Sequence, residues 1–214
     1  RKAIESMEDI KNKVRERFIR YAKIDTQSQA GSSSTPSTKK QFDLAKELKR
    51  ELEEMGAQNV RLSEQCCLFA AIPSNIKEKE KEKAVKSVGF IAHMDTTPDA
   101  SGTNVRPWVL ENYDGGDVLL NKERNIILES ARFPSMKKYV GHDMIFTDGT
   151  TLLGGDDKAA VAAIMTFAEY LCGHPEVHHG EIQLGFTPDE EVGRGTENFD
   201  VKDFGAEVAY TMDG

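Results

Sequence analysis

Acidic residues and a histidine follow several apolar segments of this 214-residue chain. The clearest case is Glu190-Glu191, which comes shortly after the apolar run at 182–186. Adjacent carboxylates repel each other, and glutamate is seldom buried without a partner. A glutamate pair beside a core segment is therefore a candidate cation site, with one carboxylate as the ligand and the other free to act as a base.

Three other segments place similar groups after apolar runs: His93 with Asp95, then Asp156, then Asp213. Each lies in or beside a turn that contains Gly or Thr/Pro, near a strand end, where open α/β sheets bind ligands. Zinc accepts imidazole nitrogen and carboxylate oxygen, and two metal ions held close together can polarise a carbonyl. His93, Asp156, Glu191 and Asp213 are therefore candidate metal ligands.

Asp95 lies two residues beyond His93, so both side chains point to the same side of an extended segment. Its carboxylate could then accept the second imidazole proton and fix the tautomer that binds metal. Each motif is weak when taken alone, because paired glutamates are commonly a solvated face and Asp156-Asp157 could simply cap a helix. Their joint occurrence at four predicted strand ends favours a shared metal site.

The apolar pattern predicts strands alternating with helices, and hence a mostly parallel α/β sheet. We expect helices over 8–21 and 159–171, and strands at 60–62, 68–72, 85–92, 182–186 and 208–212. A further helix between the two has one apolar face, made of Phe42, Ala45, Leu48, Leu52 and Met55. Thr38 and Gln41 predict a capping box before the second helix, and Gly56 predicts its end. Residues 77–83 read as a solvated turn, and residues 96–142 as an excursion from the sheet. The segments 144–147 and 151–153 read as a hairpin around Asp148-Gly149.

Charge and composition argue against a nucleic-acid-binding, a membrane-spanning or an exported protein. The net charge of −8 argues against a nucleic-acid surface. No apolar run reaches the roughly 18 residues of a membrane helix, and the charged N-terminal segment 1–13 lacks a signal core. We therefore expect a cytoplasmic protein that binds neither nucleic acid nor membrane. The three cysteines have no CxxC spacing, which favours free thiols.

Three strings carry a resemblance to a known family: His93-Met94-Asp95-Thr96, DGTTLLGGDDKA at 148–159, and TPDEEVG at 187–193. They resemble the peptidase T family, the tripeptide aminopeptidase branch of the dizinc exopeptidases. The wider family also contains glutamate carboxypeptidase and succinyl-diaminopimelate desuccinylase. The resemblance runs from about Val14 to Gly214. It implies an α/β fold whose mostly parallel mixed sheet has helices on both faces.

The resemblance also implies a role for each candidate ligand. Asp156 would bridge two zinc ions, and the peptide bond from Asp156 to Asp157 would be cis. His93 and Asp213 would complete one site, and Glu191 would bind the other ion.

Two further residues receive catalytic roles from the resemblance. Glu190 would be the general base for a water that bridges the metal ions, and Asp95 would support His93. The implied reaction is release of the N-terminal residue from a tripeptide.

The resemblance further implies that residues 1–214 are the N-terminal portion of a catalytic domain. A lid or dimerisation domain and the rest of the catalytic domain, with a histidine of the second zinc site, would lie outside them. We expect the full-length protein to be a homodimer with two zinc ions per subunit. This portion should hold at most one ion well and be inactive alone. The alternatives are a related metal-dependent deacylase or carboxypeptidase, or a non-catalytic metal-binding module of the same fold.

Overall fold

A five-stranded mixed sheet forms the centre of the molecule. The computed structural model describes residues 6–76 and 85–213, so the turn predicted over 77–83 lies outside the described residues. The sheet has the order β1-β2-β8-β3-β9. Its strands are β1 (Gln58–Leu62), β2 (Leu68–Ile72), β8 (Ile182–Thr187), β3 (Val88–His93) and β9 (Val208–Thr211). β8, β3 and β9 run parallel, whereas β2 is antiparallel to both β1 and β8.

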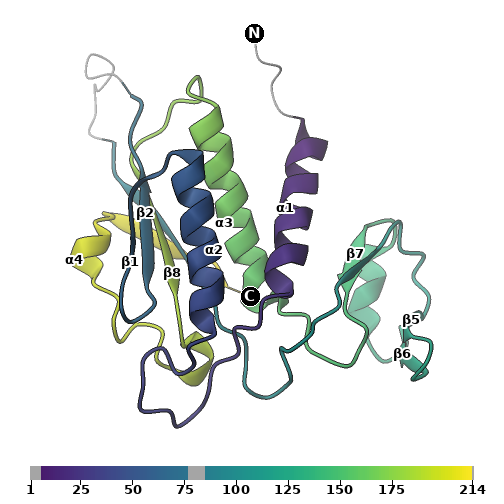
Figure 1. Cartoon of the computed structure of the whole chain (residues 1–214). Helices are drawn as coiled ribbons and strands as arrows, with labels where there is room; N and C mark the ends of the chain where they lie inside the picture. Colours follow the sequence, from purple (N-terminus) through teal and green to yellow (C-terminus); the bar gives the residue numbers. More distant parts are fainter. Residues whose placement is uncertain (1–5, 77–84, 214) are drawn as a thin grey trace.

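Helices cover both faces of this sheet, as the sequence predicts (Figure 1). α1 (Met7–Ala22), α2 (Gln41–Met55) and α3 (Gly155–Gly173) share one hydrophobic core with the strands. The short α4 (Val201–Phe204) lies on the other face, where Phe204 packs with Phe69 and Phe199. None of the described helices has the length and apolar character needed to span a membrane.

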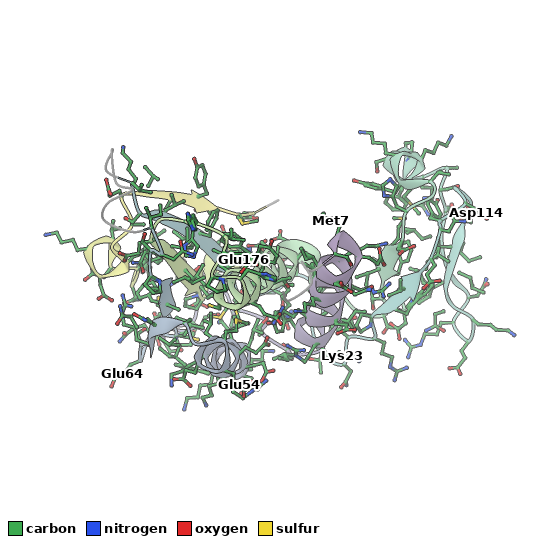
Figure 2. All side chains as sticks on the ribbon, turned by 90° about the horizontal axis from the view of Figure 1, so that it is seen from above. Met7, Lys23, Glu54, Glu64, Asp114 and Glu176 are labelled. Atoms are coloured by element: carbon green, nitrogen blue, oxygen red, sulfur yellow. The ribbon has the colours of Figure 1, made fainter. Side chains whose placement is uncertain are left out.

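The excursion predicted over 96–142 is present and forms a small subdomain. β4 (Trp108–Leu110) pairs with β7 (Met144–Phe146), and β5 (Val118–Asn121) pairs with β6 (Ile126–Leu128). A 3₁₀ helix, Pro134–Tyr139, adds to its separate small core. Figure 2 shows α1, labelled at Met7 and Lys23, between this subdomain, labelled at Asp114, and the main sheet with its other helices.

The hairpin predicted around Asp148-Gly149 is wrong. β7 pairs with β4 from earlier in the chain, and residues 151–153 are not a strand. The carboxyl group of Asp148 instead accepts hydrogen bonds from the N–H and hydroxyl of Thr150, which closes a local turn. The strand predicted from Val85 begins at Val88.

The predicted capping box of α2 is also wrong. α2 begins after Lys40 with no side-chain cap, and the Thr38 hydroxyl donates to the backbone oxygen of Gln27. The side-chain amide of Gln41 bonds Asp189, 148 residues away, at 2.7 Å and the Thr38 hydroxyl at 3.3 Å, but these are not the two reciprocal backbone bonds of a capping box. Gly56 ends the helix in the left-handed conformation (φ 86°), as predicted.

Candidate metal centre

The site lies where three parallel strands of the sheet end. His93 is the last residue of β3 and pairs in register with Thr187, the last residue of β8. β9 runs parallel to β3 on its other side and ends two residues before Asp213. Because the carboxyl ends of parallel strands meet at one edge, residues distant in sequence converge there.

Three of the four expected ligands form a compact group. One ligand atom from each of His93, Asp156 and Asp213 lies within 4.8 Å of the others. His93 Nε2 is 2.9 Å from Asp156 Oδ1, and Glu190 Oε2 lies 3.7 Å from the same nitrogen. One buried imidazole and two exposed carboxyl groups are the kind of donor set that zinc accepts.

The orientation of His93 is fixed by Asp95. Nδ1 lies 2.9 Å from the backbone oxygen of Asp95, and because that oxygen can only accept, Nδ1 carries the hydrogen and Nε2 faces the group. The Asp95 carboxyl oxygen lies further away, at 3.4 Å. Burial alone lowers the pKa of His93, but the hydrogen bond and negative charge of Asp95, with the charges of Asp157 and Glu190, raise it to about 9.

Asp156 is delivered by the glycine turn before α3. Gly154 adopts the left-handed conformation (φ 83°) that favours glycine, and the helix proper begins after Asp157. The peptide bond between Asp156 and Asp157 is cis, as the sequence resemblance implies.

Asp157, which was not among the candidate residues, is buried beneath the group. Its carboxyl oxygen accepts the backbone N–H of His93 at 3.3 Å. Burial raises the pKa of Asp157 to about 7, in spite of the neighbouring His93. The only sign in the sequence that Asp157 supports the site is its position next to Asp156.

Glu190 and Glu191 sit on a short 3₁₀ turn, Glu190–Val192, that follows β8. Asp95 accepts the backbone N–H of Glu190 at Oδ1 (2.9 Å) and that of Glu191 at Oδ2 (3.2 Å). Glu191 is not part of the group of three, but it lines a cleft of about 380 Å³ together with Asp156. Burial, followed by the charge of Asp156, raises the pKa of Glu191.

The other histidines lie elsewhere. His142 is in the subdomain, where its backbone bonds Tyr113 and Tyr139. His174 directly follows α3, at the opposite end of this 19-residue helix from Asp156. At 1.5 Å per residue the separation is about 27 Å, too far for a shared ion. The segment with His178 and His179 follows it, and the backbone oxygen of His179 bonds Ser74 and Asn75 at that end of the molecule.

Comparison with known proteins agrees with the resemblance read from the motifs. No family model matches the chain. Peptidase T of Clostridium botulinum (strain Loch Maree / Type A3) is 53% identical over 201 residues, which cover 94% of this chain and 48% of that protein. Peptidase T of Alkaliphilus oremlandii is 53% identical over 205 residues. The chain thus spans about half the length of the curated relatives it matches.

Solved structures give the same result for the fold. Aminopeptidase PepT from Bacillus cereus aligns with a TM-score of 0.64 at 20% identity, covering 95% of this chain and 43% of that one. A tripeptidase from Staphylococcus aureus aligns with a TM-score of 0.63 at 24% identity and the same coverages. Over the residues that match, the chain is therefore similar in sequence to peptidase T and similar in fold to these two solved structures.

Proposed function

We propose that this chain is part of a metal-dependent aminopeptidase that removes the N-terminal residue from tripeptides, with Glu190 as the general base. The observation that carries the proposal is the group of His93, Asp156 and Asp213 within 4.8 Å, with Glu190 Oε2 3.7 Å from His93 Nε2. A peptidase T relative at 53% identity supports the peptide substrate. The match to about half of that relative supports reading residues 1–214 as the N-terminal part of a catalytic domain.

The donor set fits zinc, and Asp156 would be a ligand of both ions. His93 and Asp213 would complete one site, and Glu191 would hold the second ion. When bound, such ions act as Lewis acids that polarise a peptide carbonyl and make water more acidic.

The chain's own residues supply the remaining requirements. Asp95 holds His93 through its backbone oxygen and holds the Glu190 turn through its carboxyl group. Glu190 is half-exposed beside His93, where it can take a proton from water and pass it to the departing amine. The cleft lined by Thr96, Thr97 and Asp156 gives the substrate a place beside these groups.

We further propose that the full-length protein is a cytoplasmic homodimer and that its native metal is zinc. A related deacylase or carboxypeptidase is the second candidate, because the same metal group could serve amide hydrolysis in either. A free Glu190 beside the group speaks against a purely metal-binding module, which has no need of a base.

The test is a substrate comparison with the complete gene product loaded with zinc. Tripeptides, dipeptides and N-acyl amino acids are offered at equal concentration, and released amino acids are identified. Release of only the N-terminal residue from tripeptides supports the proposal. Cleavage of N-acyl amino acids or of C-terminal residues in preference would replace it with the second candidate.

A further inference from the structure

The turn that carries Glu190 and Glu191 is fastened to a distant loop through a buried aspartate. Asp189 is fully buried, and its carboxyl group accepts hydrogen bonds from the Ser37 N–H (2.7 Å), the Ser37 hydroxyl (2.5 Å) and the Gln41 side-chain amide (2.7 Å). Its own N–H donates to Gln41 Oε1 at 3.1 Å. Four hydrogen bonds therefore join the residue before Glu190 to Ser37 and to Gln41, the first residue of α2.

Arg194 makes a second connection between the same two segments. Its guanidinium donates to the backbone oxygens of Ser32 (3.1 Å) and Ser34 (3.0 Å) and to the Thr35 hydroxyl (2.5 Å). Arginine suits this place because its planar group offers several donors in fixed directions. The loop 32–37 is thus bound to both ends of the turn, at Asp189 and at Arg194.

The turn needs such support because it has little packing of its own. None of the residues Glu190–Val192 is buried, and the two adjacent carboxylates repel each other. Asp189 also adopts a left-handed conformation (φ 59°), which few residues other than glycine, asparagine and aspartate adopt. Asp95, two residues after β3, also holds the turn, through the N–H groups of Glu190 and Glu191. Asp189 and Arg194 add the connections to the loop 32–37.

We propose that Asp189, with Ser37 and Gln41, and Arg194 are positioning residues that set where the carboxyl groups of Glu190 and Glu191 point. None of them touches the metal group, so they would act only through the turn. The expected effect of these residues on turnover rests on the proposed function. Their expected effect on the mobility of the turn rests on the hydrogen bonds alone.

The experiment uses four variants of the complete gene product. Ser37→Ala removes one hydroxyl donor to Asp189, and Ser37→Thr keeps it. Arg194→Ala removes the second connection. Arg61→Ala is the matched control, because Arg61 also bonds a carboxyl group and a backbone oxygen of one residue, Asp203, but on the far side of the sheet beside α4. Each variant is measured for hydrogen–deuterium exchange in the peptide 189–195, zinc content, kcat and KM.

Loosening the turn should raise the exchange rate of peptide 189–195 in Ser37→Ala and Arg194→Ala, but not in Ser37→Thr or Arg61→Ala. The kcat should fall by about 10-fold with KM nearly unchanged, because small misplacements of a catalytic group cost up to about 10²-fold. A general loss of stability would instead affect Arg61→Ala as well.

The two proposals can fail separately. Unchanged exchange in both Ser37→Ala and Arg194→Ala would overturn the positioning inference, whatever the activity. If exchange becomes faster but the unchanged protein has no peptidase activity, Ser37 and Arg194 do hold the turn, and the proposed function is wrong. Faster exchange with unchanged kcat in an active enzyme would also contradict the inference, since the turn would then not set the base.

Discussion

The carboxyl group of Asp95 accepts a hydrogen bond from the backbone N–H of Glu190, with 2.9 Å between Oδ1 and N. The same residue offers its backbone oxygen to His93 Nδ1. Asp95 therefore links the proposed metal ligand of β3 to the proposed base after β8. From the sequence we expected Asp95 to support only His93, but it also holds the backbone of Glu190.

Replacing Asp95 by asparagine should lower turnover by roughly 10–100-fold, the usual effect of changing a group that orients metal ligands. Asparagine turns one acceptor oxygen into a donor that faces the N–H of Glu190 or Glu191. The bond from His93 to the backbone oxygen should survive. Zinc content should therefore fall less than kcat, measured on the same preparation. Asp99→Asn, an exposed residue of the following loop, is the control. Equal turnover in the two variants would contradict the linkage.

Glu51 should be essential for stability and unimportant for chemistry. It is buried, and accepts bonds from Arg17 Nε (2.9 Å), Arg20 Nη2 (2.5 Å) and the Tyr21 hydroxyl (2.8 Å). Glu51→Ala leaves buried Arg17 without that partner, and breaking a buried pair costs about 3–5 kcal/mol.

The measurement for Glu51→Ala is the free energy of unfolding in denaturant. Glu54→Ala, one turn along α2 at an exposed position, should change it little. If both variants lost the same free energy of unfolding, the buried hydrogen bonds of Glu51 would contribute nothing to stability.

Glu169 should contribute stability that disappears in acid. Burial raises the pKa of this carboxyl group, but hydrogen bonds from Lys13 and Arg17, each at 2.7 Å, outweigh it and lower the pKa below its ordinary value. A lowered pKa in the folded state means that the contribution is present above the unfolded value, about 4.3, and is lost as pH falls further.

Urea unfolding of Glu169→Gln at pH 7 and at pH 3 tests this sign. The variant should be less stable than the unchanged protein at pH 7, and the difference should shrink at pH 3. Glu16→Gln, at an exposed position of α1, is the control. A difference that grows on acidification would contradict the assigned direction.

The sequence predicted which residues come together better than it predicted the contacts around them. His93 ends β3, Asp156 lies at the start of α3 and Asp213 follows β9, so the convergence of these three could be inferred from the order of the elements. Asp189 meets Ser37 and Gln41 across about 150 residues of chain, and nothing in the local pattern indicates that pairing.

The local errors have the same origin. Thr38 and Gln41 have the spacing of a capping box, but their shorter hydrogen bonds, 2.7 Å each, go to Gln27 and Asp189 and not to the backbone N–H groups of the helix start. Asp148-Gly149 has the composition of a hairpin turn, but β7 already pairs with β4, and the chain after it runs to the Gly154 turn. Long-range pairing overrode local propensity at both places.

A polypeptide of these 214 residues should bind at most one zinc ion tightly. His93, Asp156 and Asp213 offer three ligands, whereas Asp156 and Glu191 offer only two carboxyl groups to a second ion. Metal analysis after gel filtration should give no more than one ion per chain, and no tripeptide turnover. His93→Ala should remove that ion. Two stoichiometric ions together with turnover would mean that another group completes the second site.

In the proposed mechanism Glu190 is the general base, and it is not one of the residues that bind the metal. The most direct measurement is zinc content and tripeptide turnover of Glu190→Gln in the complete gene product, beside His93→Ala. Glu190→Gln should keep its zinc and lose turnover by a factor on the order of 10²–10⁴, as expected when a general base is removed. His93→Ala should lose zinc. Near-normal turnover of Glu190→Gln with its zinc in place would contradict the account.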